Sequence, residues 1–181
     1  MLAYLEGEAK QKGPNFVILM TKSGVGYLVN VPVRLIGKKK LGLFIYHYQT
    51  EKSEALYGFS DFKERELFGE LLKVPGLGPK GALGLLSFYS PTQILEIISQ
   101  GDVNKIEIVP GIGRKTARKI LAELSTTVSF ESKGKEAIIE ALKSLGFTLT
   151  EAQESLKYLD GSENTLESQI KKILKERGKN V

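Results

Sequence analysis

The residues Val74-Pro-Gly-Leu-Gly-Pro-Lys-Gly-Ala82 and Val109-Pro-Gly-Ile-Gly-Arg-Lys-Thr-Ala117 form an internal repeat whose copies are 35 positions apart. Six of the nine positions are identical, and Leu77 in the first copy corresponds to Ile112 in the second. Apolar residues at helical spacing flank each copy, so each one predicts a helix, a tight hairpin and a second helix. This tandem repeat decides the fold of the middle of the chain.

The repeat also contains the residue types that bind phosphate groups. Its glycines permit positive φ values and close backbone approach, and the helix that follows begins with N–H groups that have no partner within the helix. The predicted DNA-binding residues are the hairpin glycines and the cations beside them: Gly76, Gly78, Lys80, Gly111, Gly113, Arg114, Lys115 and Arg118. None of these groups reads base edges, so we expect sequence-independent, salt-dependent binding to the nucleic-acid backbone.

The repeat has two other interpretations. Residues 76–81 match the dinucleotide fingerprint G-x-G-x-x-G, but no parallel-sheet strand precedes them, and Thr116 replaces the third glycine in the second copy. A helical hairpin that serves only as a scaffold is the stronger alternative. A second copy with its lysine at the same position argues against it.

Residues 1–62 predict a small β-barrel or sandwich. Four or five short β-branched and aromatic runs, among them Phe16–Met20 and Leu43–Tyr48, are separated by Gly, Asn and Pro. The period then changes at Asp61, which we expect to cap a helix and to form a capping box with Glu64. Residues 63–125 therefore predict a helical domain built around the two hairpins.

The last part of the chain predicts a linker over residues 126–134 and a three-helix domain over residues 135–181. The linker is assigned because its polar residues show no clear period. We expect Thr150, with Gln153, to cap the second tail helix. The residues expected in the core of this domain are Leu142, Leu145, Phe147, Leu156 and Leu159.

Composition excludes several classes of site. The 181 residues include no Cys and one His, so disulfides, Cys-ligated metals and thiol nucleophiles are impossible, and His47 is interpreted as structural. We expect no metal, no cofactor and no catalytic residue. No apolar run approaches the ~20 residues that cross a bilayer, and the acidic N-terminal stretch does not resemble a signal peptide. A cytoplasmic protein without membrane contact is expected, and its net charge of +5 is compatible with a polyanionic partner.

The chain resembles the RuvA family, the Holliday-junction-binding subunits of bacterial RuvAB branch-migration complexes. The resemblance rests on Gly24-Val25-Gly26-Tyr27, on Leu56-Tyr57-Gly58-Phe59, on the tandem hairpins and on Ala141–Phe147. It implies an oligonucleotide-binding (OB) fold barrel that forms the oligomer and meets the junction centre. It further implies a tandem helix-hairpin-helix DNA-binding domain, and a UBA-like three-helix domain that contacts the RuvB ATPase.

The same resemblance implies a homotetramer, or two stacked as an octamer, that binds four-way junction DNA and holds it open for branch migration in recombination and repair. The family carries an acidic pin of two adjacent acids near the junction centre. The corresponding positions here are Glu51 and Lys52, so Glu54 is the candidate for the missing acid, and a solvated loop is the competing interpretation.

The predicted function is thus a non-catalytic junction-binding subunit whose partner hydrolyses ATP. The competing enzyme class is a helix-hairpin-helix repair enzyme such as a base-excision glycosylase, which needs a catalytic Asp after the second hairpin or a lysine nucleophile. No Asp occurs between Arg118 and Phe130. A general single-strand or duplex binder is the simpler binding alternative.

Overall fold

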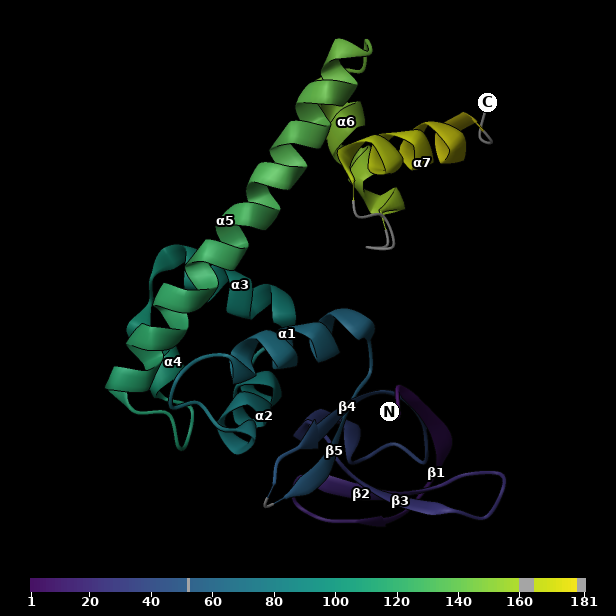
Figure 1. Ribbon diagram of the computed structural model, residues 1–181, viewed down its shortest axis with the longest axis vertical. Coiled ribbons are helices and arrows are strands. Elements are labelled where there is room, and N and C mark those ends of the chain that lie inside the picture. Colours follow the sequence, from purple (N-terminus) through teal and green to yellow (C-terminus); the bar gives the residue numbers. More distant parts are fainter. Residues whose placement is uncertain (52, 160–164, 179–181) are drawn as a thin grey trace. The chain divides into compact units, whose positions relative to one another are not determined.

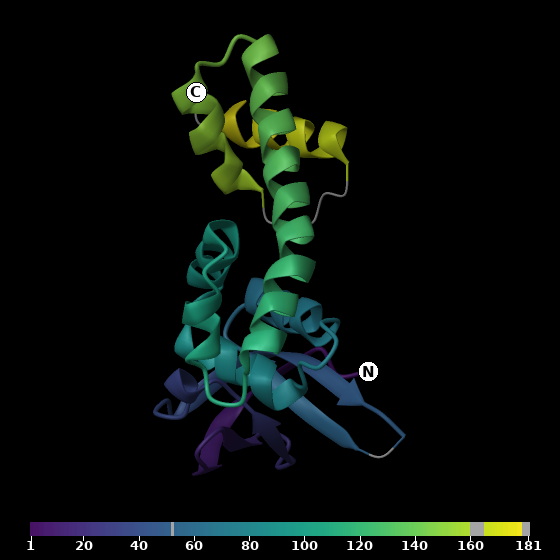
Figure 2. The same cartoon turned by 90° about the vertical axis from the view of Figure 1, so that its left-hand side faces the viewer.

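The computed structural model describes residues 1–51, 53–159 and 165–178, and it divides into two compact units, 1–125 and 126–181. Unit 1 contains a barrel and the helices that follow it (Figures 1 and 2). Unit 2 is helical. The fold class is therefore the predicted one, a β-barrel followed by helices.

Five strands close the barrel in the order β1-β2-β3-β5-β4. The strands are β1 Tyr4–Lys12, β2 Phe16–Met20, β3 Gly26–Asn30, β4 Lys40–Gln49 and β5 Glu54–Phe59. All neighbouring pairs are antiparallel except β3 and β5, which are parallel. This five-stranded closure is that of an OB fold. Strand β1 is the element that the sequence did not assign, because charged residues alternate there with small ones.

Buried residues that alternate with more exposed ones along the strands form the barrel core. Val17 and Leu19 in β2, Val29 in β3 and Leu43 and Ile45 in β4 are fully buried. Their neighbours on the same strands are more exposed, as alternation across a pleated strand requires. The turn between β2 and β3 contains Gly24 at φ 83°, where a glycine avoids backbone strain.

Helix α1 (Phe62–Leu72) attaches the helices to the barrel. Phe68 is fully buried, and its ring centroid lies 4.8 Å from that of Tyr57 and 4.9 Å from that of Phe59. Gly69 faces Tyr46 so closely that an added Cβ would lie 3.1 Å from the ring. Aromatic packing of this kind fixes α1 against β4 and β5.

Asp61 caps α1 as predicted, since its carboxylate accepts a hydrogen bond of 2.8 Å from the Glu64 amide. The predicted capping box is wrong. The Glu64 carboxylate accepts instead from the Ser60 amide and hydroxyl, both at 3.3 Å, and is paired with Arg34 of the barrel. Partial burial lowers the pKa of Arg34, and the negative charge of Asp61 opposes that shift.

Four further helices complete unit 1 or begin in it: α2 Pro79–Phe88, α3 Pro91–Gln100, α4 Val103–Glu107 and α5 Arg114–Ser144. Ser90 caps α3 in a full capping box, and Gly101 ends α3 at φ 65°. Residues 126–134, predicted as a linker, are helical within α5. The expectation of an irregular segment there is wrong. The Ser, Thr and single Gly residues of this segment lower its helix propensity, but it contains no proline that would stop the helix.

Unit 2 contains the end of α5, then α6 Leu149–Ser155, the short 3₁₀ helix η2 Leu156–Tyr158 and α7 Leu166–Gly178. Ile138, Leu142, Ala152 and Ile173 form its buried core. The prediction of Leu145 as core is wrong: it lies directly after the last residue of α5, 56% of its surface is exposed, and Ile138 and Leu142 are the residues of α5 that fill the core.

The cap of α6 also differs from the prediction. Thr148, not Thr150, caps this helix in a capping box with Glu151. The Glu151 carboxylate accepts from the Thr148 amide at 2.8 Å, so the helix begins two residues earlier than expected.

Candidate nucleic-acid interface

The two hairpins of the repeat have the same backbone hydrogen bonds. The Leu77 amide donates to the Val74 carbonyl at 3.1 Å, and the Ile112 amide donates to the Val109 carbonyl at 3.0 Å. The helix after each hairpin begins in the same way, with the Ala82 and Ala117 amides bound to the carbonyls of Gly78 and Gly113. The sequence repeat is therefore also a structural repeat.

Buried aliphatic side chains anchor each hairpin. Val74 and Leu77 in the first copy, and Val109 and Ile112 in the second, are at most 6% exposed. The hairpin copies also pack near one another, because a Cβ added to Gly81 or Gly84 would lie 3.8 Å from Ile112 or 3.5 Å from Val109. This apolar side fixes the hairpins, and their glycine-rich side is exposed.

The four hairpin glycines fall into two classes. Gly76 at φ 91° and Gly111 at φ 86° have the left-handed conformation that favours glycine. The expectation of positive φ is wrong for Gly78 and Gly113, since Gly78 has φ −86° and Gly113 is not among the residues with positive φ. A Cβ at either position would meet no atom within 4 Å. Nothing in the described part of the chain requires a glycine there, whereas close approach of another molecule would.

The cations predicted from the sequence are all exposed, on or near the first turn of a helix. Lys80 lies in the first turn of α2, and Lys115 lies at the equivalent place in α5. Arg118 lies one turn further along α5. The Arg114 guanidinium is 3.4 Å from the Glu107 carboxylate, an exposed pair that contributes little to stability.

Lys119 makes an interaction that the sequence did not predict. Its Nζ donates to the Pro75 carbonyl of the first hairpin at 3.4 Å, so it connects the two motifs. Such a link between residues 44 positions apart leaves no local sequence signal.

The electrostatics of each site follow from the helix ends. The first-turn amides of α2 and α5 have no intrahelical acceptor and carry the positive end of the helix dipole. The flanking lysines add full charges near the bare surface of Gly78 or Gly113. Each hairpin can therefore bind one phosphate group by backbone N–H donors and a lysine.

The β4–β5 hairpin carries the predicted pin residues and projects from the barrel (Figure 2). Glu51 is exposed near its tip, and Lys52 lies outside the described residues. Glu54 is also exposed, and its Oε1 lies 2.6 Å from Nε2 of His47 on the neighbouring strand β4. The structure therefore pairs Glu54 with His47.

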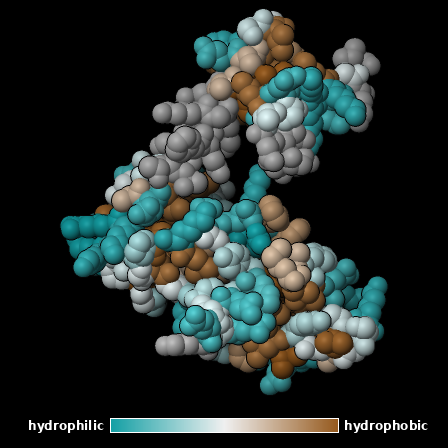
Figure 3. All heavy atoms as spheres, viewed as in Figure 1, coloured by the Kyte–Doolittle hydropathy of each residue, from teal (hydrophilic) through white to brown (hydrophobic). Residues whose placement is uncertain are grey.

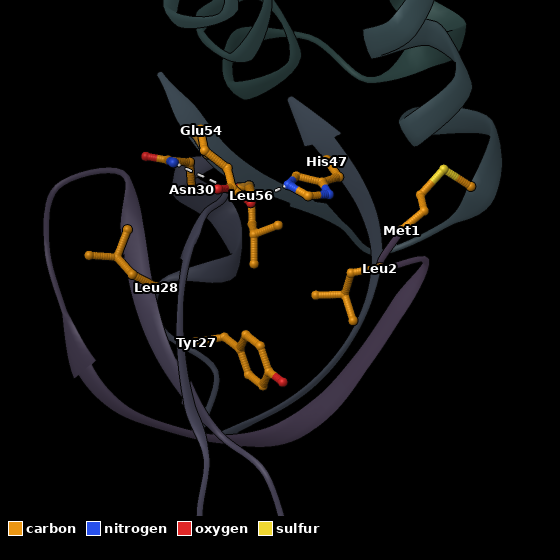
Figure 4. A pocket seen from close by; sticks show the side chains of 9 residues that line it. Met1, Leu2, Tyr27, Leu28, Asn30, His47, Glu54 and Leu56 are labelled. Atoms are coloured by element: carbon orange, nitrogen blue, oxygen red, sulfur yellow. Dashed lines mark hydrogen bonds and ion pairs between the residues drawn. The ribbon is translucent and has the colours of Figure 1, made fainter. Parts of the chain in front are cut away.

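His47 and Glu54 border a shallow pocket at the barrel surface (Figure 4). Its apolar wall includes Leu2, Tyr27 and Leu56, and Asn30 donates from its side-chain amide to the Leu56 carbonyl at 3.2 Å. The side chains of His47, Glu54 and Asn30 at this pocket thus already have hydrogen-bond partners within the barrel.

Other kinds of site are not found within the described ranges. No group of three or more His, Cys, Asp or Glu side chains there could hold a metal ion. Among these residues, too, no helix has the length and apolar character that a membrane span requires.

Comparison with known proteins gives consistent matches. Residues 1–58 match the family described as RuvA N terminal domain, and residues 68–126 match the SAM-like helix-hairpin-helix tandem. Curated relatives bear the name "Holliday junction branch migration complex subunit RuvA". The one from Thermodesulfovibrio yellowstonii is 35% identical and covers 86% of each chain. The one from Cytophaga hutchinsonii is also 35% identical, over 97% of this chain and 99% of its own, and one from Bacillus mycoides is 32% identical over 96% of each.

The bare glycines give a direct test of the interface. Replacing Gly78 and Gly113 by alanine should preserve the fold, since both methyl groups enter open space, apart from about 0.5–1 kcal/mol for the weaker helix caps. The methyl groups would separate a phosphate from the amides, and each charged hydrogen bond that is broken costs about 1.5–3 kcal/mol. We expect DNA affinity, measured by fluorescence anisotropy, to fall at least ~10-fold.

Gly37→Ala is the matched control, because its Cβ would also enter open space, away from the hairpins. Equal DNA affinity for the double variant and this control would remove the hairpins from the interface.

Proposed function

The chain belongs to the RuvA family, and on this premise we propose that it binds four-way junction DNA through its phosphates and holds the junction for branch migration. The observation that carries the proposal is the pair of equivalent hairpins, each with a bare glycine, free first-turn amides and an exposed lysine. In this role the phosphate-binding residues are Gly76, Gly78, Lys80, Gly111, Gly113, Arg114, Lys115 and Arg118. Binding of this kind is independent of base sequence.

We propose that the chain is the non-catalytic subunit of its complex and that the RuvB ATPase supplies the work. The sequence has no G-x-x-x-x-G-K-[ST] phosphate loop of its own. A base-excision glycosylase is the weaker alternative, because the matched relatives are branch migration subunits. We also propose that the protein is located in the cytoplasm of a bacterium.

We further propose that the barrel forms a homotetramer, or a stacked octamer, around the junction centre. The β4–β5 hairpin would then bring its acids to the centre as a pin that repels phosphates. Glu51 and Glu54 are the exposed acids for this role, and Glu54 also lies 2.6 Å from His47. Because Lys52 takes the place of the second adjacent acid, the net negative charge of this pin is smaller than that of the two acids in the family pattern.

We propose that unit 2 binds the RuvB ATPase, the motor subunit of the complex. Figure 3 shows apolar side chains at the surface of this unit. Leu149 at the start of α6 is 53% exposed, and Leu166 and Leu174 of α7 are 44% and 40% exposed. Since Ile173 and Leu142 already fill the core, these leucines are available to bind a protein partner.

The proposed function is tested by comparing a four-way junction with linear duplex of equal length in gel-shift experiments. The junction should bind at least ~100-fold more tightly, because several hairpins engage it at once. Equal affinity for the two DNAs would contradict the proposal. Release of a base from lesion-bearing DNA would instead support the glycosylase alternative.

The lysines are tested by the salt dependence of binding. The double variant Lys80→Ala, Lys115→Ala should bind more weakly, and the slope of log affinity against log salt should fall by ~0.9 for each phosphate that is no longer neutralised. The control Lys143→Ala, Lys175→Ala removes the same charge from exposed positions of unit 2. A slope equal to that of the wild type would exclude Lys80 and Lys115 from the DNA-binding surface.

The proposed RuvB-binding surface of unit 2 is tested by the double variant Leu149→Ser, Leu174→Ser. We expect affinity for purified RuvB, measured by surface plasmon resonance, to fall at least ~10-fold, because less apolar area is buried on binding. Junction binding should not change. Leu28→Ser, at a barrel residue that is 54% exposed, is the control, and an equal decrease there would argue against a specific surface on unit 2.

A further inference from the structure

One barrel residue, Arg34, contacts both helices of the first hairpin motif. It lies in the short 3₁₀ helix η1 (Val33–Leu35), between β3 and β4. One terminal nitrogen of its guanidinium pairs with the Glu64 carboxylate in the first turn of α1, and the other donates to the Leu86 carbonyl near the end of α2. A second link lies beside it, from the Val33 amide to the Ser87 hydroxyl at 3.3 Å.

The ion pair is partly enclosed by the protein. The Glu64 side chain is 1% exposed and that of Arg34 is 40% exposed. The Ser60 amide and hydroxyl also donate to Glu64, and the first turn of α1 places the positive end of a helix dipole near it. At its other contact, Arg34 places a positive charge at the negative end of α2. The planar guanidinium suits this double role, because it presents donors in fixed directions.

The contacts of Arg34 and Val33 with α1 and α2, here called the joint, fix the end of α2 that is opposite to its phosphate-binding end. Helix α2 has ten residues, so it is about 15 Å long. Gly78 caps its first turn, which contains Lys80, and its last turn is held by Arg34 and Val33. A change in the tilt of α2 at the held end would displace the phosphate site at the other end.

We infer that Arg34 and Glu64 are positioning residues that set the hairpins relative to the barrel and so determine the preference for a four-way junction over linear duplex. The inference rests on the proposed function. A junction must contact the barrel at its centre and the hairpins along its arms, so the distance between them matters. A linear duplex needs only the hairpins, so its binding does not depend on this joint.

Two substitutions of opposite charge separate positioning from electrostatics. Arg34→Gln lowers the net charge by one, and Glu64→Gln raises it by one. Charge alone predicts that the first weakens and the second strengthens binding to every DNA. Positioning predicts that both variants have a weaker junction preference. We expect the ratio of junction to duplex affinity to fall at least ~10-fold in each, because barrel and hairpins no longer engage the junction at the same time.

The affinities are measured by gel shift at a temperature where circular dichroism shows every variant folded. Val17→Ala is the stability control, since this fully buried barrel residue lies outside the joint. It should lower the melting temperature and keep the affinity ratio. Arg34→Lys keeps the charge without the two-armed geometry, so an intermediate ratio is expected, and this variant replaces Arg34→Gln if the latter does not fold.

A wild-type ratio in both Arg34→Gln and Glu64→Gln would overturn the inference, as would an equal decrease in Val17→Ala. Wild-type protein without any junction preference would contradict the proposed function instead, before the variants are compared.

Discussion

The burial of two aliphatic side chains in each hairpin is the constraint on which the rest of the interface depends. Val74 and Leu77, like Val109 and Ile112, must enter the core of unit 1. With these side chains turned inward, the short backbone between them has to turn sharply, and Gly76 and Gly111 provide the positive φ values that permit it. The amides that follow are then left exposed. The phosphate-binding surface is thus a consequence of packing on the opposite side of the hairpin.

The same constraint explains why the hairpins were predictable and other parts of the structure were not. The repeat combines buried aliphatics, glycines and lysines within nine residues, so its signal is local. Strand β1 was missed because its barrel-facing positions include Gly7 and Ala9, which give weak apolar alternation. The linker prediction failed because local polarity was interpreted as irregular backbone. Residues 126–134 lower the helix propensity but contain nothing that prevents a helix from forming.

Interactions between distant residues could not be predicted from the sequence. Glu64 has the spacing of a capping-box residue, yet its carboxylate is taken by Ser60 and Arg34, and the partner 30 positions away cannot be inferred from the local pattern. Lys119 adds charge beside the second hairpin, whereas its link to the Pro75 carbonyl appears only in the structure. Both interactions join elements that are independent in the local sequence pattern, so tertiary packing decides them.

Charge distribution within the barrel bears on how the proposed junction complex would work. An acid repels phosphate only to the extent that its charge is uncompensated, and repulsion falls off within about 8–10 Å at physiological salt. Glu51 and Glu54 are both exposed, Glu54 lies 2.6 Å from His47, and Lys52 stands where a second adjacent acid would be expected. A pin with so little charge per subunit requires close approach by several subunits. The place at which the barrel holds the β4–β5 hairpin therefore matters more for the proposed pin than the number of its acids. The contacts of Arg34, which fix the first helix-hairpin-helix motif to the barrel, are consistent with that requirement.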